Sequence, residues 1–206
     1  MTKVHLEVQR YADEERTIIL VGHAGHEEVN GTLGVAPGKV VLVGTVEEAR
    51  AVQISEPSRV AAVTQTTLSV DDTQEIMQAL KGRFPLMATP KTDDICYATQ
   101  NRQNAVKELV EASDAILVVG SKQSSNANRL VEVARMRGAR AYLVDSLKDV
   151  TPPMVEGVRA LGLTASASSP EWLVEEIINA FAERGARVEL VSVARERVHF
   201  ALPLAE

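Results

Sequence analysis

The chain has 206 residues, 45% of them hydrophobic and 24% charged, with a formal net charge of −6. This composition excludes a mostly disordered chain, and no apolar run approaches the roughly 20 residues of a membrane span. An acidic chain without a block of Lys or Arg is not expected to bind nucleic acid. The polar N-terminus resembles no signal peptide, so we expect a cytoplasmic protein without a membrane partner. The single cysteine, Cys96, excludes an internal disulfide and a metal site built from several cysteines of this chain.

Short apolar runs alternate with amphipathic helical patterns along the chain. Val4, Val8 and Tyr11 have helical spacing, and Ser69 begins a further helical pattern with an acid, Asp72, three residues later. Buried strands that alternate with helices are typical of parallel sheets covered on both faces, so the predicted fold class is α/β. The predicted strands are residues 17–21, 39–43, 59–63, 115–119, 140–144, 160–164 and 187–192.

The alternating pattern is interrupted near residues 88–95, where Pro90 and two acidic residues occur. We therefore predict two small parallel-sheet α/β domains, comprising residues 1–92 and 93–206. The N-terminal helical pattern has no recognisable start signal, and we expect that sequence preceding it is missing.

Four predicted strands lead into turns rich in Gly, Ser, Thr and Asn, at residues 22–26, 64–67, 120–126 and 165–170. Ligands of parallel α/β sheets bind at the carboxyl ends of strands, where helix N-termini also present N–H groups. The turns contain neither a Walker loop nor a GxGxxG sequence. Taken singly, each turn is more often a cap or turn former, but four together favour a phosphate or diphosphate site. Its side-chain donors would be Thr66, Thr67, Ser124, Ser125, Asn126 and Ser168.

The first of these turns carries His23 and His26 around Gly25, with Glu28 two residues beyond. A His-x-Glu pair after a buried strand can bind a phosphate and supply a proton. A metal site and a plain polar turn are the alternatives, although helical metal ligands usually have i,i+4 spacing. Cys96 opens a predicted helix, where the dipole favours a thiolate that acts as metal ligand or nucleophile. A small buried hydrophobic residue is the other interpretation of this cysteine.

Five sequence runs occur together in one order across essentially the whole chain. The runs are GHAGHEEVNGT (22–32), TQTTLSVDDT (64–73), DDICYAT with NRQ (93–99 and 101–103), GSKQSSNANRL (120–130) and TASASSP (164–170). In these motifs the chain resembles the 4-hydroxy-3-methylbut-2-enyl diphosphate reductase family, also called IspH or LytB. Five coincident motifs make this resemblance highly specific.

The resemblance implies three small α/β domains around a central [4Fe-4S] cluster held by three cysteines. It implies an oxidoreductase that reductively removes the hydroxyl of an allylic diphosphate substrate. The products are isopentenyl and dimethylallyl diphosphates, in the methylerythritol phosphate (non-mevalonate) isoprenoid pathway. Electrons would come from a donor such as ferredoxin or flavodoxin.

The same resemblance implies a role for each matching residue. Cys96 matches a cluster ligand and His26 a diphosphate-binding histidine. Glu28 matches the acid that delivers protons to the departing hydroxyl and the allyl intermediate, and Thr66 belongs to the same proton network near the substrate. Ser124, Asn126 and Ser168 match diphosphate ligands, with Ser125 beside them.

This chain departs from the family at its N-terminus, where the first domain and its cysteines have no counterpart. One of the three cluster cysteines is present, and cluster binding generally requires several thiolates. We therefore expect the chain to be incomplete and inactive alone, and to need the missing domain in cis or in trans. A non-catalytic diphosphate-binding α/β module is the alternative function.

Overall fold

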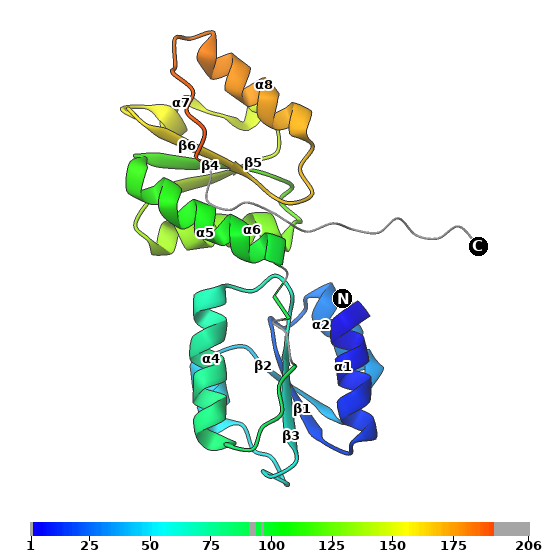
Figure 1. The fold of residues 1–206 in the computed structure, drawn as a ribbon. Helices are drawn as coiled ribbons and strands as arrows, with labels where there is room; N and C mark the ends of the chain where they lie inside the picture. The colour runs from blue at the N-terminus through cyan, green and yellow to red at the C-terminus, as the bar shows by residue number, and fades with distance from the viewer. Residues whose placement is uncertain (1, 91–93, 96, 192–206) are drawn as a thin grey trace, which may run out of the picture.

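The computed structural model describes residues 2–90, 94–95 and 97–191, which form two three-stranded sheets with flanking helices (Figure 1). The first unit alternates helices and strands throughout. Its elements are α1 (Thr2–Asp13), β1 (Thr17–Val21), α2 (Glu27–Val35), β2 (Val40–Val43), α3 (Val46–Ala51), β3 (Val60–Thr64) and α4 (Val70–Arg83).

The second unit repeats this alternation. Its elements are α5 (Tyr97–Ala112), β4 (Ala115–Val119), α6 (Ser125–Met136), β5 (Arg140–Val144), the 3-10 helix η1 (Leu147–Asp149), α7 (Pro152–Val155), β6 (Leu161–Ala165) and α8 (Glu171–Ala182). None of the helices in the described ranges is long and apolar enough to cross a membrane.

Both sheets are parallel and have the same strand order, with the first strand of each unit in the centre. The orders are β2-β1-β3 and β5-β4-β6. In the first sheet Ile19 pairs with Val41 on one side and Ala62 on the other. In the second, Leu117 pairs with Tyr142 and Leu163. The predicted α/β fold with parallel sheets is confirmed.

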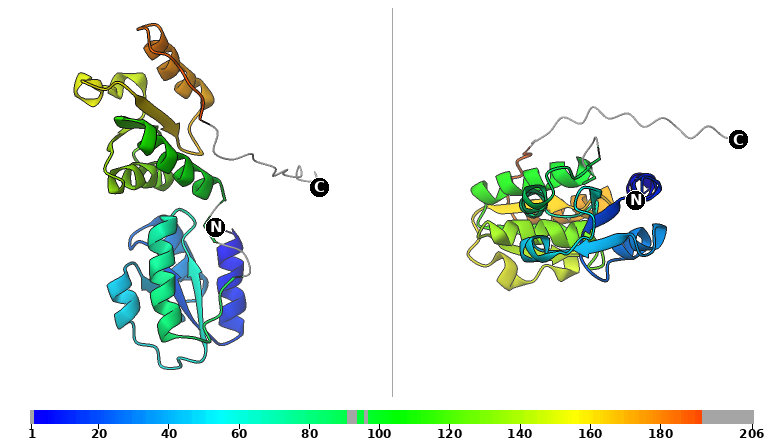
Figure 2. Two further views of the ribbon diagram at one scale, coloured as in Figure 1. Left: turned by 60° about the vertical axis from the view of Figure 1, so that its left-hand side comes forward. Right: turned by 90° about the horizontal axis from the view of Figure 1, so that it is seen from below.

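Helices cover each sheet on both faces, because the central strand carries apolar side chains on both of its faces. Ile18 and Leu20 of β1 pack against α1 and α2, whereas Ile19 and Val21 pack against α3 and α4. In the second unit α5 and α6 cover one face and α8 covers the other. The α5–α6 layer is the one that lies toward the first unit (Figures 1 and 2).

The connection between the units stays close to the first sheet at residues 94 and 95. Ile95 belongs to the hydrophobic core of the first unit. Asp94 accepts hydrogen bonds from the backbone N–H of Thr64 (3.0 Å) and from the Lys3 ammonium (3.0 Å). Burial raises the pKa of the Asp94 carboxyl, and these hydrogen bonds act in the opposite direction. The domain boundary between residues 92 and 93 remains a prediction.

The strand predicted at residues 187–192 is wrong over residues 187–191, which have no regular structure. Leu190 is 91% exposed, so the alternation of apolar and polar residues over 187–191 does not pack against a hydrophobic core. A strand requires a sheet edge to pair with and a face to bury, and propensity alone does not form one. Residue 192 lies outside the described part of the chain.

Candidate functional site

The four polar turns follow β1, β3, β4 and β6, as the sequence predicted. Two glycines let a helix start close to the end of a central strand. A Cβ on Gly22 would lie 2.7 Å from Val29 Cγ2, and a Cβ on Gly120 would lie 2.7 Å from Ala127 Cβ. Glycine at both places therefore allows α2 and α6 to begin directly beside the strand ends.

Glu28, which is buried, and Thr66, which is half-buried, contact each other between the turns that follow β1 and β3. Glu28 is 5% exposed. Its Oε1 accepts the backbone N–H of Thr66 (2.9 Å), and its Oε2 lies 3.0 Å from Thr66 Oγ1. This is the proximity that the proton-network interpretation requires. The carboxylate is fixed by two hydrogen bonds, both with Thr66.

His26 and Ser125 join the two units directly, because His26 Nε2 is hydrogen-bonded to Ser125 Oγ. His26 is the N-cap of α2, and its Nδ1 accepts the backbone N–H of Glu28 at 3.1 Å. An Nδ1 that accepts leaves the ring proton of a neutral imidazole on Nε2, which donates to the serine. The N-termini of α2 and α6 consequently meet at this contact, and helix N-termini favour anions.

Asn126 lies next to this contact and has no hydrogen-bond partner. Both its amide nitrogen and its amide oxygen are buried, each with almost no exposed surface. Buried polar groups are nearly always hydrogen-bonded, and an unpartnered one costs about 1–3 kcal/mol. An amide in this position, beside two helix N-termini, has the donor that a polar ligand would use.

The remaining predicted ligands make local contacts in the structure. Ser124 caps α6 by accepting the backbone N–H of Ala127 at 3.3 Å. Ser168 is exposed, and its hydroxyl lies 3.3 Å from that of Ser166. Thr67 accepts a hydrogen bond from Gln65. Within the described ranges no hydrogen bond connects Ser168 to His26 or Ser125, so a single cleft containing all of them remains a prediction.

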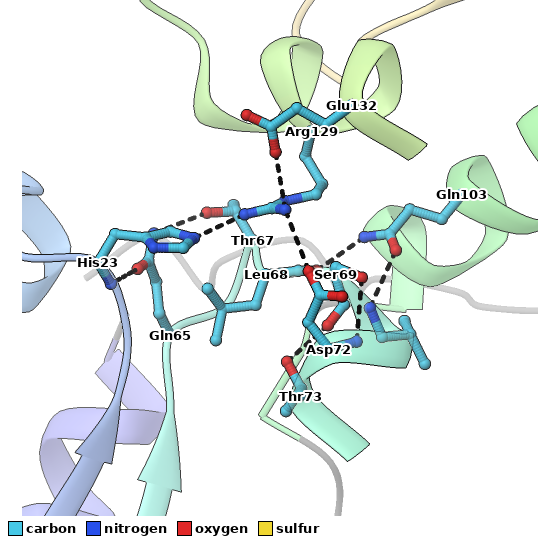
Figure 3. A network of polar contacts seen from close by, with 11 residues as sticks. His23, Gln65, Thr67, Leu68, Ser69, Asp72, Thr73, Gln103, Arg129 and Glu132 are labelled. Carbon is cyan, nitrogen blue, oxygen red and sulfur yellow. Dashed lines mark hydrogen bonds and ion pairs between the residues drawn. The ribbon is translucent and has the colours of Figure 1, made fainter. Parts of the chain in front are cut away.

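A cavity of about 220 Å³ opens at the carboxyl end of the first sheet, between β1, β2 and α4. Its lining includes His23, Ser69, Asp72 and Arg129 but not His26 or Asn126. The imidazole of His23 faces Arg129, whose guanidinium nitrogen lies 2.6 Å from Nε2 (Figure 3). Partial burial, followed by the positive charge of Arg129, lowers the pKa of His23.

The lowered pKa of His23 gives the stability a predicted pH dependence. A histidine whose folded pKa lies below its unfolded value, about 6.5, stabilises the protein fully above that value. The contribution is lost as the pH falls below 6.5 toward the folded pKa, because the unfolded chain then binds the extra proton. We expect His23→Gln to flatten this part of the profile, measured by urea unfolding between pH 5 and 7.5. Parallel profiles for the two proteins would contradict the assignment.

His23, His26 and Glu28 do not form a metal-ligand set, because each faces a different partner. Among the residues that the structure describes, no group of three His, Cys, Asp or Glu side chains is arranged to hold a metal ion. Cys96, the predicted cluster ligand, lies outside the described residues. It is the only cysteine of the chain. Since cluster binding generally requires several thiolates, the residues of this chain do not by themselves fit a [4Fe-4S] cluster.

Sequence reasoning missed the polar residues that connect the units. Gln103 of α5 is fully buried; its Oε1 accepts Val70 N–H (3.0 Å) and its Nε2 donates to Leu68 O (2.8 Å). Gln103 and Arg129 both lie within the five motifs, in runs 101–103 and 120–130, but the motifs assign a role to neither. No local pattern separates these two side chains from exposed glutamines and arginines, because the partners that connect them to the first unit are 33 or more residues away.

Comparison with known proteins agrees with the motifs. Residues 1–182 match the LytB protein family. The chain belongs to the LytB family.

Curated relatives carry the name 4-hydroxy-3-methylbut-2-enyl diphosphate reductase. The Bordetella pertussis protein is 51% identical over 204 residues, which cover 98% of this chain and 63% of the relative. The Streptomyces avermitilis protein is 50% identical over 205 residues, covering 98% and 61%. The chain thus spans somewhat less than two thirds of the length of these relatives.

A solved structure from the family supports the fold. The E-1-hydroxy-2-methyl-but-2-enyl-4-diphosphate reductase of Plasmodium falciparum superposes with a TM-score of 0.83 at 38% identity, covering 87% of this chain and 56% of that one. A second structure, described as the terminal enzyme of the non-mevalonate pathway, gives a TM-score of 0.51 at 29% identity and covers 88% and 64%.

Proposed function

We propose that this chain is the diphosphate-binding and proton-delivering part of a 4-hydroxy-3-methylbut-2-enyl diphosphate reductase. The reaction removes the hydroxyl of the allylic diphosphate reductively and yields isopentenyl and dimethylallyl diphosphates. The observation that carries the proposal is the buried, unpartnered amide of Asn126 at the point where two helix N-termini meet. Family membership names the substrate class that this arrangement suits.

The diphosphate would take hydrogen bonds from His26, Ser125 and Asn126. The Nε2–H of His26 donates to Ser125 Oγ, which leaves the Ser125 hydroxyl proton free to donate to a phosphate oxygen, and a phosphate group beside the pair would take the His26 donor in place of that contact. The first-turn N–H groups of α6 add neutral donors, and no acidic residue occupies that first turn. Ser124 and Ser168 are the further proposed ligands, from neighbouring turns.

Glu28 and Thr66 would deliver protons. A protonated Glu28 can donate from Oε2 to Thr66 Oγ1, 3.0 Å away, while the threonine hydroxyl passes its own proton to the substrate. The backbone N–H of Thr66 holds the other carboxylate oxygen, so the acid keeps one orientation as its charge changes. Burial of Glu28 limits competing proton transfer to water.

The electrons for the reaction require components beyond this chain. Cys96 would supply one thiolate ligand of the [4Fe-4S] cluster, the group that transfers electrons to the substrate, and the other thiolates would come from a further domain. Ferredoxin or flavodoxin is the proposed class of electron donor.

Asn126→Ala should weaken the binding of inorganic diphosphate to the 206-residue chain about ten- to a hundredfold. Hydrogen bonds to charged groups contribute about 1.5–3 kcal/mol, and 1.4 kcal/mol corresponds to about a factor of ten in affinity. Isothermal titration calorimetry at neutral pH measures the change. Asn179→Ala, on the exposed surface of α8, is the matched control and should bind as the unaltered chain does.

Equal affinity of the Asn126→Ala variant and the unaltered chain would exclude Asn126 as a diphosphate ligand. The alternative function, a non-catalytic diphosphate-binding module, shares this binding site. The two are distinguished by turnover in a complex with the part of a full-length relative that this chain does not span, because the module would not support turnover.

A further inference from the structure

Arg129 lies at the centre of the polar contacts that join the two units (Figure 3). Its charged side chain is only 10% exposed. The guanidinium contacts His23 Nε2 at 2.6 Å, Glu132 at 2.7 Å and Asp72 at 3.6 Å. These partners belong to three segments: the turn after β1, α6 itself and the first turn of α4. Because the guanidinium is planar and two of its partners, His23 and Asp72, belong to the first unit, the contacts favour one docking of α6.

The Arg129–His23 contact runs beside the His26–Ser125 contact. Arg129 follows Ser125 by four residues, so both lie on the same face of α6. His23 and His26 belong to the same turn. Two contacts one helical turn apart thus connect the same pair of segments. A rotation or shift of α6 that breaks the first contact would also change the second.

The Nε2 atom of His23 is suited to accept a hydrogen bond from the Arg129 guanidinium. Arginine only donates, so the Nε2 that it contacts must be the unprotonated nitrogen of a neutral ring. Gln65 holds the backbone of the same residue, because its Oε1 accepts the His23 N–H at 3.1 Å. A contact within the first unit, between Gln65 and the His23 backbone, therefore positions the His23 imidazole independently of Arg129.

We propose that Arg129 is a positioning residue that docks α6 on the turn after β1, and thereby sets the spacing between His26 and Asn126. The diphosphate that this spacing would bind rests on the proposed function, whereas the docking of α6 by Arg129 does not. Replacing Arg129 removes a largely buried cation, so α6 loses its contacts with His23 and with the half-exposed Asp72 of the first unit. We expect α6 to move to a different position against the first unit, because the contacts that hold it in its present position are lost.

A separate bridge keeps the units attached when Arg129 is changed. Gln103 of α5 holds the loop between β3 and α4 through two hydrogen bonds of its buried side chain. Lys107 of the same helix pairs with Asp71 at 2.8 Å. Variants at position 129 should consequently alter the geometry of the site while both units stay folded and in contact.

The test compares Arg129→Gln and Arg129→Lys with Arg59→Gln in the 206-residue chain. Arg59 pairs with Glu15 and lies outside the proposed site, so it serves as a matched loss of an arginine. The first measurement is the imidazole nitrogen resonances of His26 by NMR, assigned with a His26→Gln variant. The second is the affinity for inorganic diphosphate by calorimetry.

Arg129→Gln should shift the His26 Nε2 resonance and weaken diphosphate binding about tenfold or more. Arg129→Lys should restore the His26 Nε2 resonance and the diphosphate affinity in part, because lysine retains the charge but lacks the planar guanidinium. Arg59→Gln should change neither. An unshifted His26 resonance in Arg129→Gln would overturn the proposal.

The two measurements also separate the positioning role from the proposed function. If the unaltered chain binds no diphosphate and Arg129→Gln still shifts His26, the positioning role stands and the proposed function fails. If Arg129→Gln does not fold, His23→Ala in place of it removes the acceptor alone and must shift the same resonance. Its failure to do so would overturn the proposal.

Discussion

Glu28→Gln should lower turnover about 10²–10⁴-fold in a complex with the part of a full-length relative that this chain does not span. Glutamine keeps the size of the side chain and can still accept the Thr66 N–H, so the local structure should persist. It has no transferable proton, and the site offers no second carboxylate in contact with Thr66 among the described residues. Steady-state kinetics with a chemical reductant measure the loss, and substrate affinity should be nearly unchanged.

Glu27→Gln is the matched control for this prediction. Glu27 is the preceding residue in the first turn of α2 and is exposed. Its replacement removes the same charge from the same helix terminus without touching Thr66, so turnover should be nearly unaffected. Near-normal turnover of Glu28→Gln would assign proton delivery to another group.

The 206-residue chain alone should fail to assemble a stoichiometric four-iron cluster during anaerobic reconstitution. Its one thiol is Cys96, and a single thiolate leaves the remaining irons without protein ligands. Co-production with the part of a full-length relative that the chain does not span should restore the cluster. Iron and sulfide content, together with the visible absorbance, report the result.

Cys96→Ser in the completed complex is the control for the cluster prediction. It should lower the cluster content that the added domain restores, because one proposed thiolate is then absent. A stable four-iron cluster on the monomeric 206-residue chain would refute the argument from cysteine number.

The strands were predictable because their signal is local. Each buried strand is a short apolar run, and β1 and β4 begin and end at the predicted residues. The rule that turns at carboxyl ends share one edge of a parallel sheet then brought Glu28 near Thr66, as observed. The unsuccessful strand at 187–191 shows the limit of the same signal, since an apolar alternation does not reveal whether a sheet edge is available.

The docking of the units was not predictable from local patterns. Arg129 and His23 are separated by 106 residues, and neither differs in composition or spacing from residues that remain in solvent. Buried polar contacts of this kind depend on which helix face is turned toward the other unit. That choice is a property of the assembled fold, so the sequence identified ligand candidates but not the residues that hold them in place.

The separation of the two cores has a consequence for motion and for folding. Among the described residues, the buried clusters of β1–β3 and of β4–β6 have no member in common. Each unit can therefore close its core from contacts within its own sequence, without contacts from the other unit. Contacts between the units are largely polar, and such interfaces open more easily than a core. Amide hydrogen exchange should accordingly be slowest in β1 and β4, whereas the first turns of α2 and α6 should exchange through a hinge opening that leaves both sheets intact.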